Sequence, residues 1–393
     1  MSQMYLNRSL EARLVQLNTF FPAIVLIGPR QIGKTSLVAA LRNQIAAKSI
    51  YLDMERPADL AALTNLEAFA EQYLDTLIII DEVQHRKGLF TELRSVIDRN
   101  RKPGRFILLG SASFDLIRDA SETLAGRIAI EELTGMSMQE IGSEVDYLLH
   151  WQRGGYPKSV LAPSDELSFI WRENLLRTYL ERDLAGIGLV SNPVQMRRVL
   201  TMLAHQSGQL LNYQSLAKSL QMDHRTLKEH LNILEQTFVA RRLPAYHANI
   251  KKRLVKSPKM YLRDSGVLHA LLGITNYLVL SRHPVFGPSF ESYVVEQIYV
   301  AIQHQQTYLY FYRTSNGAEL DLILERGGVI VAVVEIKTTP KPKLSKGLYT
   351  SRDDLGNPTA LIICPTIDPP YPLADDIIVL GPKDIHRVVG DLF

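Results

Sequence analysis

Short runs of wholly apolar residues recur through the first third of the chain, each ending at a glycine or an acidic residue. Such runs lack the in–out alternation of a half-exposed strand, so they predict strands buried on both faces. Segments with helical spacing lie between them, which predicts an α/β fold with a parallel sheet and helices on both faces. The predicted strands are residues 23–27, 49–53, 77–80 and 106–111, and the predicted helices are residues 1–20, 67–73 and 90–99.

The pattern becomes mainly helical after residue 165. Residues 165–205 are predicted to be helical, and a turn separates two shorter helices at 213–220 and 224–235. Asp223 is the predicted N-cap of the second of these helices. Two strand patterns follow, at residues 238–243 and 260–262. A helix-turn-helix followed by two strands predicts a winged helix.

The last part of the chain predicts a second α/β domain. Asn316-Gly317 is a strong hairpin signal, and Gly327-Gly328 predicts another turn. A helix at residues 289–305 precedes predicted strands at 308–312, 319–324, 329–336, 361–364 and 377–380.

Composition narrows the class of protein. The 393 residues predict two or three domains at roughly 150 residues each. The net charge of +3 is too small to identify a partner class. Cys364 is the only cysteine, which excludes an internal disulfide and a cysteine zinc cluster. No leader pattern and no apolar run of about 18 residues is present, so we expect a soluble, cytoplasmic protein without a membrane partner.

Residues 28–35 match the phosphate-binding pattern G-x-x-x-x-G-K-[ST] at every fixed position. A predicted strand precedes them and a predicted helix follows, so backbone N–H groups and a helix N-terminus would surround the phosphates of a nucleotide. Lys34 would reach the β and γ phosphates, and the Thr35 hydroxyl would bind Mg²⁺. The alternative is an ordinary glycine turn. The predicted contacts to ATP and Mg²⁺ are Gly28, Pro29, Arg30, Gln31, Ile32, Gly33, Lys34, Thr35 and Ser36, with Asp81.

Asp81 and Glu82 follow the apolar strand at 77–80. Ligand-facing groups of a doubly wound sheet lie at the carboxyl ends of its strands. We therefore expect Asp81 to be a water-mediated Mg²⁺ partner and Glu82 to be the base that polarises the attacking water. The alternative is that both are turn residues.

Two further residues are candidates for catalysis. Ser111 ends a predicted strand beside the expected nucleotide, where it would sense the γ-phosphate or hold the attacking water; the alternative is a helix cap before residues 114–120. Arg127 enters an apolar run, which favours an arginine finger offered to a neighbouring subunit over a plain surface cation. A finger of this kind would imply a homo-oligomer.

Together these segments resemble the AAA+-type ATPases of bacteria and archaea that carry a C-terminal domain of unassigned function. The resemblance covers nearly the whole chain and implies ATP hydrolysis, with Arg127 as sensor or finger. The matching segments are residues 28–35, 79–82, 109–111, 125–128, 132–133, 138–140, 154–157, 179–184 and 290–291.

Basic residues gather in and after the predicted helix-turn-helix. Residues 241–263 hold eight Lys or Arg and no Asp or Glu. Such charge favours phosphate contacts, and the start of the second helix is where base edges are read. The alternative is a winged helix that only packs. The expected contacts, with DNA favoured over RNA, are His224, Arg225, Lys228, Lys251, Lys252 and Arg253.

Asp321 is followed fourteen positions later by Glu335, and Lys337 stands two residues after Glu335. This spacing resembles the metal site of the PD-(D/E)xK nucleases. Asp321 and Glu335 would hold Mg²⁺ or Mn²⁺, Lys337 would stabilise the attacking water, and Glu291 resembles the additional helical acid of that superfamily. Glu335 and Lys337 share one face of their strand. Asp321 joins them if the hairpin loop has an odd number of residues, whereas a strict two-residue Gly-Gly loop turns it away.

The sequence thus predicts an ATPase whose nucleotide state controls a nucleic-acid-binding, metal-dependent nuclease region. The alternative is a nucleotide switch that binds protein partners and carries a silent nuclease-like domain. The expected domains are an ATPase domain at residues 1–135, a helical lid or linker at 136–205, a winged helix at 206–270 and a nuclease-like domain at 271–393.

Overall fold

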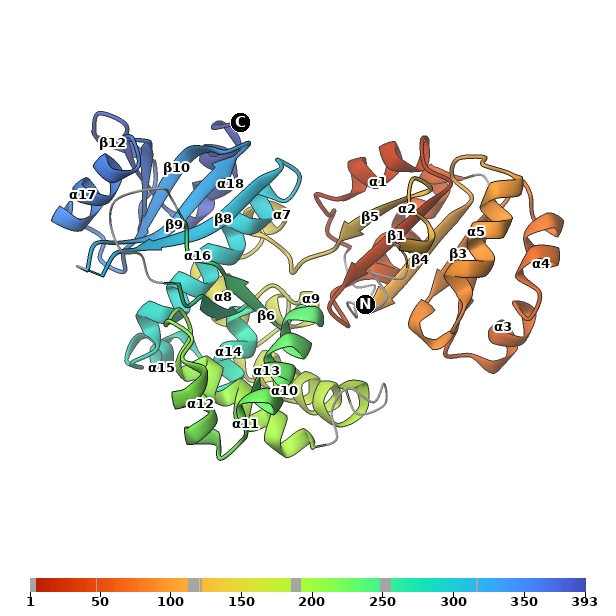
Figure 1. The fold of residues 1–393 in the computed structure, drawn as a ribbon, viewed down its shortest axis with the longest axis horizontal. Coiled ribbons are helices and arrows are strands. Elements are labelled where there is room, and N and C mark those ends of the chain that lie inside the picture. Colours follow the sequence, from red (N-terminus) through yellow and green to blue (C-terminus); the bar gives the residue numbers. More distant parts are fainter. Residues whose placement is uncertain are drawn as a thin grey trace. The chain divides into compact units, whose positions relative to one another are not determined.

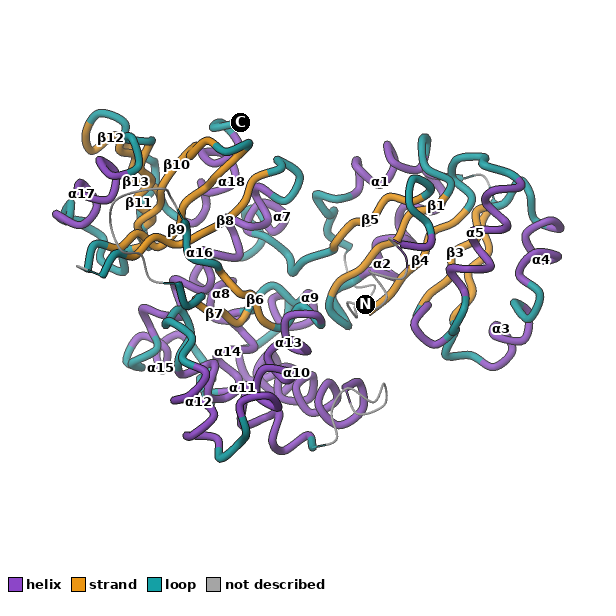
Figure 2. Tube along the Cα trace, viewed as in Figure 1, coloured by secondary structure: helices purple, strands orange, loops and turns teal. Residues whose placement is uncertain are grey.

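The computed structural model describes residues 5–46, 48–111, 120, 122–184, 192–247, 256–315 and 317–393. These residues form two compact units (Figures 1 and 2). The first unit holds residues 1–136 with 236–238, and the second holds residues 137–235 and 239–393. Within the described part of the chain, no helix is both long and apolar enough to cross a membrane.

The first unit is built on a five-stranded sheet in the order β2-β3-β4-β1-β5, and every neighbouring pair is parallel. The predicted parallel sheet is therefore confirmed. The strands are β1 (Ala23–Gly28), β2 (Ser49–Asp53), β3 (Leu77–Asp81), β4 (Phe106–Ser111) and β5 (Ile128–Glu132). The helices are α1 (Glu11–Asn18), α2 (Lys34–Ile45), α3 (Pro57–Ala62), α4 (Leu66–Gln72) and α5 (Leu89–Arg99), with a 3₁₀ turn at Val83–His85.

Helices cover the two faces of this sheet. One face of β1, β3 and β4 packs against α4 and α5 in a cluster that includes Val25, Ile80, Leu108 and Leu93. Helices α1 and α2 contact β1 and each other, away from that cluster. Because side chains alternate along a strand, a strand covered on both faces must be apolar throughout. β1 and β3 are accordingly buried at every position.

The second unit begins with helices that were only partly predicted. The predicted helical stretch 165–205 ends its first helix at Thr178, continues as a π-helical turn and starts a new helix at Pro193. Asn192 caps that helix by accepting a hydrogen bond from the Gln195 N–H at 3.1 Å, and proline suits the first helical position. These elements are α7 (Met138–Ile141), α8 (Tyr147–Arg153), α9 (Pro157–Val160), α10 (Asp165–Thr178), the π-helical turn (Tyr179–Leu184) and α11 (Pro193–His205).

The predicted helix-turn-helix elements follow, with a pair of antiparallel strands. Asp223 Oδ1 accepts hydrogen bonds from the N–H groups of Arg225 and Thr226, at 2.7 and 3.2 Å, so its predicted capping role is confirmed. Residues 248–255 between the two strands lie outside the described part of the chain. The elements are α12 (Tyr213–Leu220), α13 (His224–Gln236), β6 (Ala240–Leu243), β7 (Lys259–Leu262), α14 (Ser265–Leu271) and α15 (Tyr277–Ser281).

A six-stranded mixed sheet completes the second unit, in the order β12-β13-β11-β10-β9-β8. β8, β9 and β10 are antiparallel neighbours, and β11 is parallel to β10. The elements are α16 (Phe286–Ile302), β8 (Thr307–Arg313), β9 (Glu319–Arg326), β10 (Val329–Ile336), α17 (Lys346–Asp354), β11 (Thr359–Ile363), β12 (Tyr371–Ala374), β13 (Ile377–Leu380), a 3₁₀ turn (Pro382–Asp384) and α18 (Ile385–Gly390).

The hairpin between β9 and β10 decides between the two loop lengths that the sequence left open. Arg326 pairs with Val329, so the loop is the two-residue Gly327-Gly328 and not an odd-numbered one. The register then shifts by one residue between Ile330 and Ala332. A bulge of this kind adds one residue to one strand and reverses which face later residues occupy. The bulge, and not an odd-numbered loop, therefore sets Asp321 and Glu335 on the same face of the sheet.

Candidate functional site

The phosphate-binding loop connects β1 to α2 at the carboxyl edge of the first sheet. Gly28 has φ of 149°, and a Cβ at this position would stand 2.3 Å from the carbonyl oxygen of Leu133. Gly33 has φ of 104°, a conformation that side chains rarely adopt. The loop therefore requires glycine at both fixed positions, and its backbone is shaped as a cradle for phosphate.

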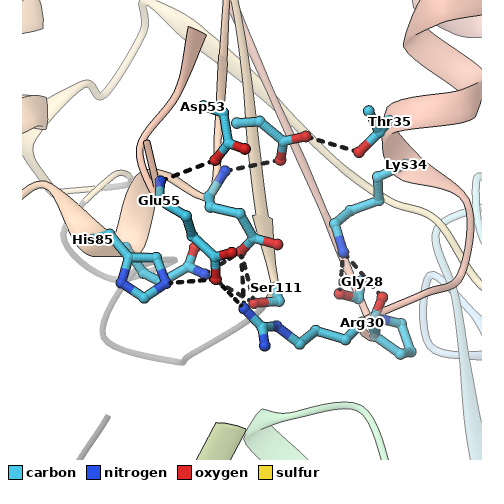
Figure 3. Close-up of polar contacts among 12 residues, drawn as sticks. Gly28, Arg30, Lys34, Thr35, Asp53, Glu55, His85 and Ser111 are labelled. Atoms are coloured by element: carbon cyan, nitrogen blue, oxygen red, sulfur yellow. Dashed lines mark hydrogen bonds and ion pairs between the residues drawn. The ribbon is translucent and has the colours of Figure 1, made fainter. Parts of the chain in front are cut away.

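Lys34 is buried beneath this loop, with 7% of its surface exposed. Its Nζ donates hydrogen bonds to the carbonyl oxygens of Gly28 and Pro29, both at 2.9 Å (Figure 3). Burial lowers the pKa of Lys34 to about 8, against the opposing effect of the carboxylates of Glu82 and Asp81. An ammonium held only by neutral carbonyls and distant carboxylates is suited to pair with an anionic phosphate.

Asp81 ends β3 and lies next to the loop, with 4% of its surface exposed. Its Oδ2 accepts hydrogen bonds from the hydroxyls of Thr35 and Tyr51, each at 2.7 Å, and its Oδ1 accepts from the Glu82 N–H at 2.8 Å. Thr35 and Asp81, predicted separately as ligands around Mg²⁺, are thus in direct contact. Tyr51 was not predicted; β2 pairs with β3, with Asp53 beside Asp81, which brings Tyr51 to this site.

Glu82 adopts a left-handed backbone conformation, with φ of 51° and ψ of 44°. Its Oε2 accepts hydrogen bonds from the Gln84 amide and from the Ser111 hydroxyl, the latter at 3.3 Å. Gln84 also donates to the Ser111 hydroxyl at 2.9 Å. Non-glycine residues in this region of φ and ψ cluster at functional sites. Ser111 therefore lies beside Glu82 as expected, and Gln84 is an unpredicted residue that holds both.

Arg30 belongs to the loop and points toward these acids (Figure 3). Its guanidinium donates to Glu55 Oε1 at 2.8 Å and lies 3.8 Å from Glu82 Oε2. His85 Nε2 is 3.5 Å from the same Glu55 oxygen. Glu55 and His85 had no motif to mark them, because only the parallel order of β2 and β3 brings them to this edge.

Arg127 lies at the amino end of β5, since Ile128 pairs with Ala23 at the start of β1. This is the edge opposite the phosphate-binding loop, so Arg127 does not reach the nucleotide site of its own chain. Its guanidinium holds Asp98 in a bidentate ion pair, with both N–O distances at 2.8 Å. The Arg127 guanidinium lowers the pKa of Asp98 to about 2. A role toward a neighbouring subunit remains a prediction.

The predicted nuclease residues lie in the second unit. Asp321 Oδ2 accepts a hydrogen bond from the Ile336 N–H at 2.7 Å. Burial and the nearby Glu291 raise the pKa of Asp321 to about 7. Glu335 Oε1 is 2.5 Å from Lys337 Nζ and 3.2 Å from Ser345 Oγ. Among the described residues, no group of three or more His, Cys, Asp or Glu side chains is arranged to hold a metal ion. Metal binding by Asp321 and Glu335 therefore stays a prediction.

Four of the described basic residues in the stretch 241–263 are paired with acids, so they do not form the open positive surface that the composition indicated. Arg241 and Arg263 both bind Glu296, at 3.0 and 2.7 Å. Arg242 lies 3.3 Å from Glu235. Lys259 is buried among acids, as described below. Lys251, Lys252 and Arg253 lie outside the described residues.

The start of α13 keeps exposed polar and charged groups. His224, Arg225 and Lys228 all face solvent. Arg225 Nε donates to Glu229 Oε1 on the next turn at 3.1 Å, which offsets part of its charge. The predicted nucleic-acid contacts in this helix are therefore accessible.

Three family models match successive parts of the chain. An AAA domain matches residues 21–142, a domain of unknown function (DUF8612) matches residues 144–278, and a second domain of unknown function (DUF4143) matches residues 286–383. The AAA match spans the phosphate-binding loop, Asp81, Glu82 and Arg127.

Relatives and solved structures extend this comparison. Uncharacterized proteins of Mycobacterium tuberculosis (Rv2008c) and Mycobacterium bovis (Mb2031c) are each 40% identical over 386 residues, covering 98% of this chain and 86% of the relative. A Walker-type ATPase of Pyrococcus abyssi has a TM-score of 0.44 and 14% identity, over 68% of this chain and 96% of that chain. RuvB of Thermotoga maritima has a TM-score of 0.33 and 18% identity, over 61% and 91%. The chain belongs to the same family as the two mycobacterial proteins, and its first unit carries an AAA-type, P-loop ATPase-like domain.

Proposed function

We propose that the first unit binds ATP with Mg²⁺ and hydrolyses it. One observation carries this proposal: Lys34, Thr35, Asp81 and Glu82 meet at the carboxyl edge of one parallel sheet, beside a loop that requires Gly28. That edge is where doubly wound sheets bind their ligands. These residues fit Mg²⁺ with a triphosphate, because a buried ammonium, a hydroxyl and a carboxylate lie together beside the loop.

Each residue has a defined part in the proposed reaction. The loop backbone and Lys34 bind and orient the phosphates, while Thr35 and Asp81 would hold Mg²⁺, which supplies charge neutralisation when bound. Glu82 accepts the proton of the attacking water as the water oxygen bonds to the γ-phosphorus and the bond from that phosphorus to the β–γ bridging oxygen breaks. Ser111 and Gln84 fix the direction of the Glu82 carboxylate. The products are ADP and inorganic phosphate.

ATP turnover by the full chain in the presence of Mg²⁺ tests this proposal. Lys34→Met removes the ammonium but keeps an apolar chain of similar length, and we expect ATP binding to weaken about 10- to 100-fold, as for loss of a charge-assisted contact. Glu82→Gln keeps binding and lowers turnover about 100- to 10,000-fold. Lys102→Met and Glu71→Gln are matched controls in exposed ion pairs. Normal turnover in both site variants would refute the assignment.

We infer that the second unit has a function of its own: it contacts nucleic acid under the control of the nucleotide state of the first unit. The exposed residues at the start of α13 and the acids of β9 and β10 support it. Binding of duplex DNA at low salt is expected to fall in the combined variant His224→Ala, Arg225→Ala and Lys228→Ala, with Lys102→Ala as control.

Cleavage of DNA or RNA with Mg²⁺ or Mn²⁺, lost in Glu335→Ala, would support a nuclease. A chain that neither binds nor cuts nucleic acid at low salt would support the alternative, a nucleotide switch that acts on protein partners through a silent domain.

A further inference from the structure

Lys259, on β7, places its ammonium among the carboxylates of the nuclease-like part. Its Nζ lies 3.1 Å from Glu291 Oε1, 3.1 Å from Glu319 Oε1 and 4.0 Å from Asp321 Oδ1. Only 4% of its side chain is exposed. Glu291 belongs to α16, while Glu319 and Asp321 belong to β9, so one lysine joins three elements of the unit.

The charge of Lys259 compensates that of the acids around it. An isolated ammonium or carboxylate is costly to bury, and a buried ion is tolerated when it is paired and hydrogen-bonded. Although burial alone would lower the pKa of Lys259, Glu291, Asp321 and Glu319 outweigh that effect and raise the pKa. Lys259 therefore stays charged at neutral pH and acts as the counter-ion of the cluster.

The space beside this ammonium is closed by neighbouring groups. Tyr261, two residues along β7 on the same face, donates its hydroxyl to Glu291 Oε1 at 2.6 Å. Gly208 packs against the same carboxylate, since a Cβ there would stand 3.2 Å from Glu291 Oε1. The ring centroid of Phe311 lies 5.6 Å from Lys259 Nζ. Glu291 is thus held toward Lys259 by its own hydrogen bonds.

A second observation concerns Glu335, on β10. Glu335 is buried, with 7% of its surface exposed, and its Oε2 atom has no hydrogen-bond partner. Val334 pairs with Leu322, and the Ile336 N–H donates to Asp321 Oδ2 at 2.7 Å. One residue further along this register, Glu335 falls opposite Asp321, which sets the two side chains on one face of the sheet. A buried carboxylate oxygen without a donor is a ligand atom for a hard cation such as Mg²⁺ or Mn²⁺.

We propose that the Lys259 ammonium takes the place of a metal ion in this acidic site: it neutralises Glu291 and Asp321 and keeps a divalent cation from binding them together with Glu335. The site binds a metal ion only when this positive charge is removed. This inference deepens the second proposed function by giving its acidic site a means of control, and it does not depend on ATP hydrolysis.

Titration of the nucleotide-free full chain with Mn²⁺, followed by electron paramagnetic resonance, tests whether Lys259 blocks metal binding. The wild type is expected to show no Mn²⁺ site that depends on Asp321. Lys259→Met is expected to gain one, binding at least tenfold more tightly, and Lys259→Met/Asp321→Asn is expected to lose it. Lys259→Arg keeps the positive charge and should behave as the wild type does.

Two results would overturn the proposal that Lys259 blocks metal binding. One is equal Mn²⁺ affinity in the wild type and Lys259→Met, and the other is a gained site that survives Asp321→Asn. If Lys259→Met does not fold, Lys259→Met/Glu319→Gln removes one charge of each sign and carries the same expectation. ATP turnover measured on the same samples separates the two proposals, because its absence counts against the ATPase assignment and leaves the metal result standing.

Discussion

The Thr35 hydroxyl donates a 2.7 Å hydrogen bond to Asp81 Oδ2, so the phosphate-binding loop is tied directly to the end of β3. Tyr51 donates to the same oxygen at the same distance. The two hydroxyls hold the Asp81 carboxylate in one orientation beside the loop. A hydroxyl that donates its hydrogen keeps its oxygen lone pairs, so this hydrogen bond is compatible with the proposed roles of Thr35 as a direct Mg²⁺ ligand and of Asp81 as a partner through water.

Asp81→Asn should separate metal use from nucleotide binding. The amide keeps the shape of the side chain but loses the negative charge, so we expect Mg²⁺-dependent ATP turnover to fall about 100-fold, while metal-free ATP binding changes little. Turnover measured against Mg²⁺ concentration checks this, with exposed Asp75→Asn as the matched control. Unchanged Mg²⁺ dependence in Asp81→Asn would remove Asp81 from the metal site.

Gln84 is expected to be a positioning residue for Glu82. Gln84→Ala frees the Glu82 carboxylate, and we expect kcat to fall about tenfold with little change in KM. Gln84→Glu sets a second negative charge beside Glu82 and should raise its pKa, which moves the acidic limb of the pH–kcat profile to higher pH. A purely structural role would lower stability in both variants without moving that limb.

Lys34 makes ATP affinity depend on pH. Its pKa is about 8 in the free protein, and phosphate pairing needs the ammonium form, so the pKa rises on binding. Below pH 8 the affinity should be constant. Above it, a proton must be taken up with ATP, and affinity should fall up to tenfold per pH unit. Calorimetric titration at pH 7, 8 and 9 measures this, and Lys34→Met should bind weakly with no such slope.

Arg127 and Asp98 allow the finger hypothesis to be tested against a simple ion pair. If Arg127 acts on a neighbouring subunit, Arg127→Ala should lower ATP turnover about 1,000-fold or more, whereas Asp98→Asn should preserve it. The wild-type rate per molecule should also rise with protein concentration. Normal turnover in both variants, combined with reduced thermal stability, would identify the pair as structural.

The sequence predicted the first sheet well because its strands are buried on both faces. β1 and β3 are buried at every position and apolar as far as Asp81, and no surface alternation obscures them. β12 was missed for the opposite reason: all four of its residues are exposed and one is Pro372, so it has no burial pattern. An edge strand that packs on nothing leaves no hydrophobic signature.

The site was predicted where its residues stand in a motif or at the end of an apolar strand. Residues 28–35 match a motif, and Asp81, Glu82 and Ser111 end or directly follow predicted strands. Tyr51 and Glu55 reach the site through the pairing of β2 with β3, which no local pattern encodes. Lys259 shows the same limit in the second unit, because the basic stretch around it indicated an exposed surface while its partners lie on α16 and β9.

His269 should make the second unit sensitive to acid. It is fully buried; its Nδ1 lies 2.9 Å from the Gln152 carbonyl oxygen and its Nε2 lies 2.6 Å from Ser289 Oγ. Burial lowers the pKa of His269 to about 3, below the value of about 6.5 expected in the unfolded chain. The neutral ring therefore donates from Nδ1 to the carbonyl and accepts at Nε2 from the hydroxyl. Protonation puts a hydrogen on Nε2, so this nitrogen can no longer accept the hydrogen bond from Ser289.

The direction of the pH effect follows from these two pKa values. Between pH 6.5 and 3 the His269 ring is protonated in the unfolded chain and neutral in the folded unit. Its contribution to the free energy of unfolding is therefore complete above pH 6.5 and is lost as pH falls. The expected slope from this residue is about 1.4 kcal/mol per pH unit.

Trp151 and Trp171 both lie in the second unit, so tryptophan fluorescence during denaturant unfolding reports on that unit alone. His269→Gln should be less stable at pH 7 and should lose this slope, whereas His205→Gln, at an exposed position, should keep it; an unchanged slope in His269→Gln would assign the acid sensitivity to other groups.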